Sequence, residues 1–185
     1  MNKTEVVNTT NIANELLAQL RAEKRKSART KSPFVHIPHA PIMNMKGRYS
    51  RITLQTRWAW RWTGRPYYGH DRKLAYTGGV LIKARIPSPK YCGMAKSKEW
   101  SMKSPWTSAD YARMVDRAIT WAIKELRTQE YREQLHDAFE AAPQALRDAS
   151  AAHGTAVGWP VMYDEMTIDN CNQWLDWLKE KQTNG

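Results

Sequence analysis

The stretch that decides the fold is RITLQTRWAWRW, which runs from Arg51 to Trp62. Polar or basic residues alternate in it with apolar ones, so Arg51, Arg57 and Arg61 fall on one side of an extended chain and the tryptophans fall on the other. An alternation with a period of two residues predicts a β-strand with one buried face. We therefore expect residues 51–62 to form a strand of a half-buried sheet.

Trp58, Trp60 and Trp62 share the apolar side of this strand and admit two interpretations. The rings pack under helices in a core, or they form an open platform on which flat ligands stack. A chain with nine Trp and only two Phe needs Trp in its core, which favours burial. With the rings buried, the alternation turns the arginines of the strand outward as a cationic strip.

The segments around this strand predict the rest of a small antiparallel sheet. Three prolines make residues 31–43 an extended linker. Residues 63–66 are typical of a turn, residues 74–77 of a short strand, and residues 80–86 of another strand whose alternate positions face inward. Residues 87–105 contain several Lys and show no clear period, so we expect a long basic loop there.

Helical periodicity appears at both ends of the chain. The apolar stripe of a first helix begins at Ile12, and Thr107 with Asp110 forms a capping pair at the start of a long helix. Pro143 can start a short helix, and a last helix follows Thr167. We therefore expect an α+β fold, in which a small, twisted antiparallel sheet is packed by helices and the C-terminal half is helical.

Charge is distributed unevenly along a chain that we expect to form a single domain over residues 1–185. Residues 1–10 are expected to be flexible, residues 11–106 to form a basic helix with the sheet and its loops, and residues 107–185 to be helical and mildly acidic. The first 106 residues carry 21 Lys+Arg against 5 Asp+Glu, and the remaining residues carry 8 against 13. This asymmetry is typical of a protein whose first part binds a polyanion while its second part assembles or contacts another protein.

Basic and aromatic residues are interleaved between residues 49 and 111, where acids are almost absent. Cations neutralise phosphates and flat rings stack on unpaired bases, so this mixture indicates non-catalytic, largely sequence-independent binding of single-stranded DNA in transcription, replication or recombination. RNA stays an alternative, because stacking serves both polymers. The expected phosphate contacts are Arg51, Arg57, Arg61, Arg65, Arg72, Lys73, Lys83 and Arg85. The expected base-stacking residues are Trp60, Trp62, Tyr67, Tyr68 and Trp100.

We expect no catalytic activity, no metal site and no cofactor. Clustered carboxylates are needed to hold a catalytic divalent cation, yet between Glu23 and Glu99 the only acid is Asp71. Two alternative functions stay open. His70 and Asp71 could act as acid and base in a nucleic-acid-cleaving enzyme, and the basic half could instead dock on an acidic protein as an interaction or inhibitor module.

The C-terminal half is expected to contact a basic partner such as a polymerase, and the apolar stripe with Trp174 and Trp177 is expected to form a homo-oligomer interface. Neither a signal peptide nor an apolar run of about 20 residues is evident, so we expect no membrane association. Cys92 and Cys171 fit free thiols, which indicates the cytoplasm. The acids expected at the partner contact are Asp164, Glu165, Asp169, Asp176 and Glu180.

The size of the chain, its basic-aromatic run over residues 57–68 and its acidic helical C-terminal half resemble those of small bacteriophage single-stranded-DNA-binding proteins. They are similar in particular to the phage cofactors that recruit a phage RNA polymerase to melted promoters. The resemblance is one of overall character and includes no aligned motif. It implies binding to exposed promoter strands, regulation of transcription through a polymerase, and location in a host cytoplasm. The chain departs from standard single-strand-binding proteins in lacking an obvious five-stranded oligonucleotide barrel.

Overall fold

The computed structural model describes residues 7–29, 41–63, 73–91, 93–160 and 162–183. It describes the backbone alone for residues 24–29, 60–63, 73–76 and 164. The chain packs as two compact units, which consist of residues 1–86 with 97–123 and of residues 87–96 with 124–185. The elements in chain order are α1 (Thr9–Arg29), β1 (Ile42–Asn44), η1 (Gly47–Tyr49), β2 (Thr53–Thr63), β3 (Lys73–Arg85), β4 (Ser97–Met102), α2 (Ser108–Ala141), α3 (Gln144–Ala156), η2 (Tyr163–Glu165) and α4 (Ile168–Thr183).

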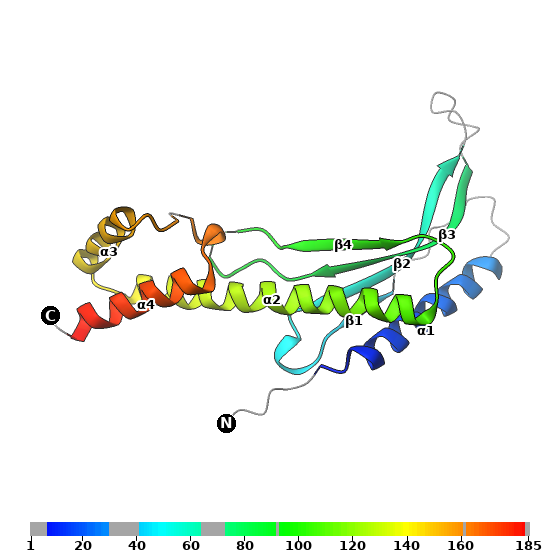
Figure 1. Cartoon of the computed structure of the whole chain (residues 1–185), viewed down its shortest axis with the longest axis horizontal. Helices are drawn as coiled ribbons and strands as arrows, with labels where there is room; N and C mark the ends of the chain where they lie inside the picture. Colours follow the sequence, from blue (N-terminus) through cyan, green and yellow to red (C-terminus); the bar gives the residue numbers. More distant parts are fainter. Residues whose placement is uncertain (1–6, 30–40, 64–72, 92, 161, 184–185) are drawn as a thin grey trace. The chain divides into compact units, whose positions relative to one another are not determined.

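The first unit contains a four-stranded antiparallel sheet with the strand order β1-β2-β3-β4 (Figure 1). The long central pair is β2 with β3, which are in register from Thr53 opposite Arg85 to Thr63 opposite Lys73. The short strand β1 pairs with the start of β2, and β4 pairs with the second half of β3. Strands that are consecutive in the sequence are therefore neighbours in the sheet, and the predicted antiparallel sheet is confirmed.

One face of the sheet is buried, and helices α1 and α2 supply the apolar side chains that cover it. In α1 the buried stripe is Ala13, Leu16, Leu17 and Leu20, and in α2 it begins with Tyr111, Met114 and Val115. Alternate strand positions face these helices, as the period-two pattern predicts. The buried residues of the sheet are Ile52, Leu54, Thr56, Trp58, Val80, Ile82, Ala84 and Ile86.

Hydrogen bonds connect both helices to this face. The indole nitrogen Nε1 of Trp58 donates to the carbonyl oxygen of Leu20 in α1 at 3.1 Å. The hydroxyl of Tyr111 in α2 donates to Oγ1 of Thr56 at 2.9 Å. The hydroxyl of Thr56 in turn donates to the carbonyl oxygen of Leu81 at 3.2 Å. Trp58 is only 8% exposed, so its interpretation as a core residue is confirmed.

Helix α2 begins with the predicted capping arrangement. The backbone N–H of Asp110 donates to Oγ1 of Thr107 at 3.2 Å, and the carboxylate of Asp110 accepts from the backbone N–H of Thr107 at 2.8 Å. The rings of Trp106 and Tyr111 pack with their centroids 5.9 Å apart and close the helix start as a hydrophobic staple. The hydrogen bond from the Thr107 backbone is also the main cause that lowers the pKa of Asp110.

The structure corrects two predictions about strands. Residues 74–77 and 80–85 belong to one strand, β3, in which Gly78 has a φ of 77° and the register with β2 shifts just after Trp58. A bulge with a glycine in the left-handed region keeps such a strand continuous. Residues 97–102, which we expected in a loop, form β4. Most side chains of β4 are exposed, so no apolar alternation marks it, and pairing with β3 orders it.

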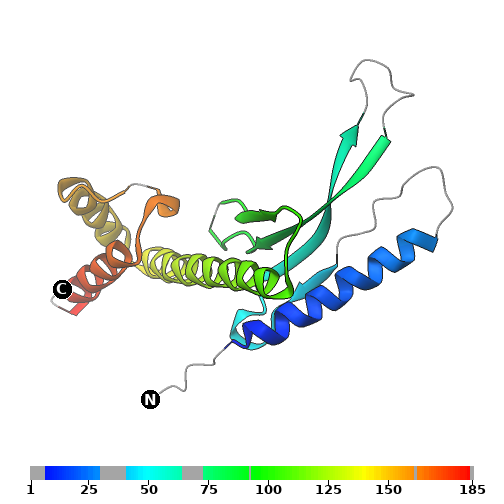
Figure 2. The ribbon, with the colours of Figure 1, turned by 45° about the vertical axis from the view of Figure 1, so that its right-hand side comes forward.

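The bulge of β3 is a point of close packing. A Cβ atom on Gly79 would lie 2.6 Å from the carbonyl oxygen of Met102, and one on Gly78 would lie 2.8 Å from Cβ of Ser104. The indole Nε1 of Trp106 donates to the carbonyl oxygen of Gly78 at 2.9 Å. Within the described strands, β2 and β3 pair only with each other beyond this point, and Figure 2 shows them as a two-stranded ribbon.

The second unit is helical, which confirms the predicted helical C-terminal half and the α+β class. The buried guanidinium of Arg132 donates to the carbonyl oxygen of Met166 through Nε at 2.8 Å and through Nη2 at 2.6 Å. Trp174 is 9% exposed and its indole N–H donates to Ser150, while Trp177 stacks on His153 with the centroids 4.9 Å apart. Both tryptophans of the expected oligomer stripe therefore pack inside this unit. Its core is centred on Leu135, Met166, Cys171, Trp174 and Leu178.

The remaining expectations about organisation have mixed outcomes. Thr9 and Thr10, at the end of the segment expected to be flexible, already belong to α1, whose start is capped by Oδ1 of Asn8 accepting from the N–H of Asn11 at 3.0 Å. The single domain stays a prediction, because compact packing units do not show how a chain folds. Among the described residues, no helix is both long and apolar enough to cross a membrane.

Replacing Tyr111 by Phe should change how stability depends on pH. Burial raises the pKa of Tyr111 to about 12 from its usual 10. The contribution of the buried, protonated phenol to the free energy of unfolding is therefore complete below pH 10 and is lost as the pH rises from 10 to 12. We expect wild type to be more stable than Tyr111→Phe by about 1 kcal/mol at pH 8, where the hydrogen bond to Thr56 is intact.

Urea unfolding at pH 8 and pH 11 measures this difference. At pH 11 wild type should have lost about 1 kcal/mol relative to the variant, and the deprotonation of lysines cancels in the comparison. Parallel curves for the two proteins across this range would contradict the buried, hydrogen-bonded hydroxyl.

Candidate nucleic-acid interface

Within the described part of the chain, no helix covers the face of the sheet opposite α1 and α2, which we call the open face. Its side chains come from the strand positions that lie between the buried ones, and they are exposed or half-buried. The strand register places Gln55 of β2 opposite Lys83 of β3, and Lys83 opposite Glu99 of β4. These residues come from three strands and share one face because residues that are paired across antiparallel strands point to the same side.

Three cations lie close together on this face, namely Arg57 on β2 and Lys83 and Arg85 on β3. Lys83 and Arg85 are two residues apart on one strand, so they lie about 7 Å apart along it. Arg57 is paired with Leu81, two residues before Lys83. Like charges held this close on one surface raise the local positive potential and attract anions.

Glu99 is the one acidic residue within the described strands, and no role for it was expected from the sequence. Its Oε2 accepts from Nη2 of Arg57 at 3.4 Å, and the two side chains are 42% and 52% exposed. An exposed ion pair of this kind contributes about 0–1 kcal/mol, so a phosphate can compete for Arg57. Among the described residues, Lys83 and Arg85 have no ion-pair partner.

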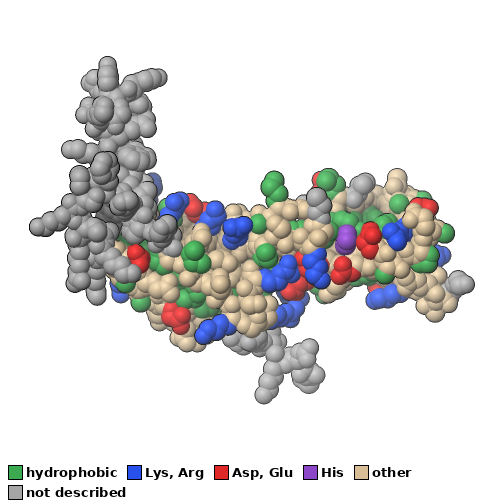
Figure 3. All heavy atoms as spheres, turned by 180° about the vertical axis from the view of Figure 1, so that it is seen from behind, with side chains coloured by type: hydrophobic (Ala, Val, Ile, Leu, Met, Phe, Trp, Pro, Cys, Tyr) green, Lys and Arg blue, Asp and Glu red, His purple; other side chains and the backbone are tan. Residues whose placement is uncertain are grey.

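The open face is hollowed only slightly. Gln55, Arg57, Leu81, Lys83 and Glu99 line a depression of about 160 Å³, which is smaller than the pockets that enclose small ligands. On the side of the molecule that Figure 3 shows, Lys and Arg side chains lie in small groups with acidic side chains between them. The shallow depression therefore suits a ligand that passes over the open face with a few ionic contacts better than one that the protein must enclose.

The other expected phosphate contacts are placed less completely. Arg51 precedes β2 and is half-buried. Arg61 is paired with Ala75 and Lys73 with Thr63 in the two-stranded ribbon, where only the backbone is described. The expected phosphate contacts that lie outside the described residues are Arg65 and Arg72.

Of the expected stacking residues, Trp100 is the one whose side chain the structure describes, and it does not lie on the cationic face. Trp100 is paired with Ile82, whose side chain is buried, so it lies on the side of the helices. Its ring contacts Trp121 of α2 edge to face at 5.6 Å between centroids, and Nζ of Lys98 lies 5.6 Å from its centroid. Trp60 and Trp62 belong to the ribbon and have only their backbone described. Tyr67 and Tyr68 lie outside the described residues, as do His70 and Asp71 of the alternative catalytic reading.

Sequence reasoning missed two members of this region. Glu99 could have been found as the single acid in the expected basic loop of residues 87–105, because a lone carboxylate among cations usually forms an ion pair. Trp121 lies within the helical pattern of α2, and that pattern does not predict that the Trp121 ring contacts a strand. In the described part of the chain, no group of three His, Cys, Asp or Glu side chains is placed to hold a metal ion.

Comparison with known proteins returns no match: no family model, no curated protein and no solved structure is similar to this chain.

Replacing Glu99 by Gln should strengthen the binding of polyanions by the open face. The change removes the acid beside Lys83 and releases Arg57 from its ion pair, so the salt concentration that elutes the protein from phosphocellulose should rise. Glu165→Gln is the matched control, because Glu165 is an exposed acid of the second unit and its loss changes the net charge equally. An equal shift in both variants would mean that Glu99 has no local effect.

Proposed function

We propose that this chain binds single-stranded DNA, without catalysis and with little sequence preference, along the open face of the sheet. The observation that carries the proposal is the placement of Arg57, Lys83 and Arg85 together on an uncovered face that has one acid, Glu99, among the described strands. Contacts to backbone phosphates supply affinity that does not depend on sequence. The weak ion pair of Arg57 leaves this residue available to a competing phosphate.

Several features favour a single strand over a duplex as the ligand. A flat sheet face presents no helix that could enter a major groove. The two-stranded ribbon of β2 and β3 contains Trp60, Trp62 and Tyr76, and aromatic residues of this kind stack on unpaired bases. A two-stranded ribbon can also enter a major groove, so duplex DNA is the necessary comparison. RNA of equal length is the second comparison.

The described cations imply a modest affinity with a defined salt dependence. Three phosphate contacts to a single strand correspond to a slope of log K against log salt of about −2. Binding would then weaken about 20-fold between 50 and 200 mM salt. Each base stacked on an aromatic side chain adds about 1–3 kcal/mol that salt does not remove.

We also propose that the second unit contacts a protein partner, with an RNA polymerase as the candidate from the resemblance to phage cofactors. Four of the five acids expected there, Glu165, Asp169, Asp176 and Glu180, are exposed, and Asp164 is described only in its backbone. Exposed carboxylates steer a basic protein surface toward this unit. The location would be the cytoplasm of a host cell, and self-association would have to use surfaces other than the buried ring of Trp174.

The triple variant Arg57→Gln, Lys83→Gln, Arg85→Gln tests the assigned contacts. Fluorescence anisotropy with labelled single-stranded DNA at several salt concentrations should give a slope less negative by about 2 than that of wild type. The matched control is Lys124→Gln, Lys179→Gln, Lys181→Gln, which removes three exposed cations of the second unit. The control should leave the slope within about 0.5 of the wild-type value.

Other outcomes would overturn parts of the proposal. Equal loss in both triple variants would mean that binding follows net charge alone. Tighter binding of wild type to duplex DNA than to single strands would favour the ribbon as a groove reader. Cleavage of labelled DNA or RNA during incubation with a divalent cation or a chelator would support the nuclease alternative centred on His70 and Asp71, whereas intact substrate is expected.

A further inference from the structure

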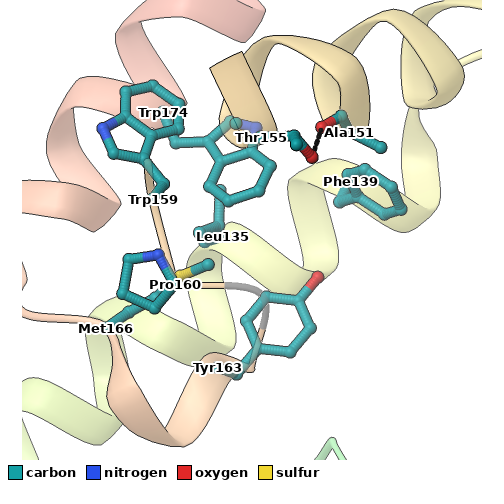
Figure 4. Close-up of a pocket in the computed structure, with 10 residues that line it drawn as sticks. Leu135, Phe139, Ala151, Thr155, Trp159, Pro160, Tyr163, Met166 and Trp174 are labelled. Carbon is teal, nitrogen blue, oxygen red and sulfur yellow. Dashed lines mark hydrogen bonds between the residues drawn. The ribbon is translucent and has the colours of Figure 1, made fainter. Parts of the chain in front are cut away.

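The second unit contains an apolar cavity of about 260 Å³ that the proposed function does not use. Helices α2, α3 and α4 and the segment before α4 form its walls, and Figure 4 shows the aromatic rings of Trp174, Phe139 and Tyr163 around it. A cavity of about 150 Å³ lined by apolar side chains is sufficient to bind benzene. The lining residues are Leu135, Phe139, Ala151, Gly154, Thr155, Trp159, Pro160, Tyr163, Met166 and Trp174.

The aromatic wall is held in place by contacts within the protein. The rings of Trp159 and Trp174 lie with their centroids 4.9 Å apart and their planes tilted by 37°. The indole N–H of Trp174 donates to the hydroxyl of Ser150, which is itself fully buried. Gly154 lets the helix approach this ring, because a Cβ atom there would lie 3.0 Å from the ring of Trp174. The position of the wall therefore does not depend on a ligand.

Of the two side-chain hydroxyls in the lining, that of Tyr163 is the one left to donate to a ligand. The indole N–H of Trp174 is bonded to Ser150, and the Thr155 hydroxyl donates to the carbonyl oxygen of Ala151 at 3.0 Å. Within the described chain, the hydroxyl of Tyr163 has no hydrogen-bond partner. Burial raises the pKa of Tyr163, and the nearby Glu140 adds to this, so the phenol stays protonated at neutral pH and can donate.

We propose that this cavity binds a planar, apolar molecule of one or two fused aromatic rings that carries a single hydrogen-bond acceptor facing the hydroxyl of Tyr163. The ring faces of the wall favour a flat aromatic ligand because aromatic groups pack best in offset or edge-to-face contact. Sites of this kind combine an apolar lining with a few polar groups that fix orientation. The assignment is independent of the DNA-binding surface, which lies in the other unit.

Two other ligands fit the cavity less well. A nucleobase brings several donors and acceptors, and the mostly apolar lining has few side-chain polar groups to pair with them, so a nucleobase would be buried with polar groups unpaired. The phosphates of a nucleic acid would also meet a unit in which 11 Asp+Glu outnumber 8 Lys+Arg over residues 87–96 and 124–185. A long alkyl chain would leave the faces of flat rings poorly covered.

Equilibrium dialysis with 2-naphthol, a two-ring probe with one hydroxyl, tests the assignment on the full chain. Wild type should bind one equivalent saturably, and Ala151→Met should weaken binding at least about tenfold because its side chain fills the cavity. Ala152→Met is the matched control, since Ala152 is an exposed neighbour on the same helix and does not line the cavity. Thr155→Met is a second blocking variant at another exposed lining position.

The role of Tyr163 has its own readout. Tyr163→Phe should weaken 2-naphthol by about threefold to tenfold and leave naphthalene unchanged, because only the probe with a hydroxyl loses a hydrogen bond. Saturating single-stranded DNA should leave the binding of 2-naphthol unchanged. If the protein did not bind DNA, the result for 2-naphthol would therefore still stand.

Three results would overturn the assignment. The first is the absence of saturable binding by wild type up to about 1 mM probe. The second is equal binding by Ala151→Met, Thr155→Met and Ala152→Met, which would place the probe elsewhere on the chain. The third is equal affinity for 1-octanol, which would show that the cavity does not select planar rings.

Discussion

The hydrogen-bond chain from Tyr111 through Thr56 to the carbonyl oxygen of Leu81 is the interaction on which the first unit depends. It joins α2, β2 and β3 inside an otherwise apolar core, where a polar group without a partner would be costly. Each hydroxyl is satisfied only when the helix lies at one height and rotation above the sheet. These hydrogen bonds thereby fix which face of the sheet the helix covers. The cations lie on the other face.

The same constraint separates the two kinds of residue that a single-strand binder combines. Arg57 and Lys83 lie on the open face. Trp58 is instead hydrogen-bonded to α1, and the ring of Trp100 packs against Trp121. In the proposed binding mode, stacking would therefore come from residues beyond the bulge of β3, in or near the ribbon. Charge and stacking would then act at different places along one bound strand, which is how a small protein can engage a length of polymer greater than one binding pocket.

Local patterns predicted the parts of the structure that local interactions determine. The alternation around Trp58 and the capping pair of Thr107 and Asp110 act within a few residues, and both are confirmed. The strand β4 and the continuity of β3 could not be predicted, because β4 has little apolar alternation and a glycine pair marks a turn as readily as a bulge. For the interface, alternation placed Arg57 outward, but its contact with Glu99 depends on strand order across 42 residues of chain.

The edges of the four-stranded part of the sheet carry features that discourage pairing with other copies. An exposed edge strand offers free N–H and C=O groups to any passing chain, and short length or charged side chains discourage such pairing. At one edge β1 is only three residues long, and at the other β4 carries Lys98 and Glu99 at its centre. In the proposed function, the four-stranded part of the sheet can thus present its open face to a polymer ligand without its edges pairing readily with other chains.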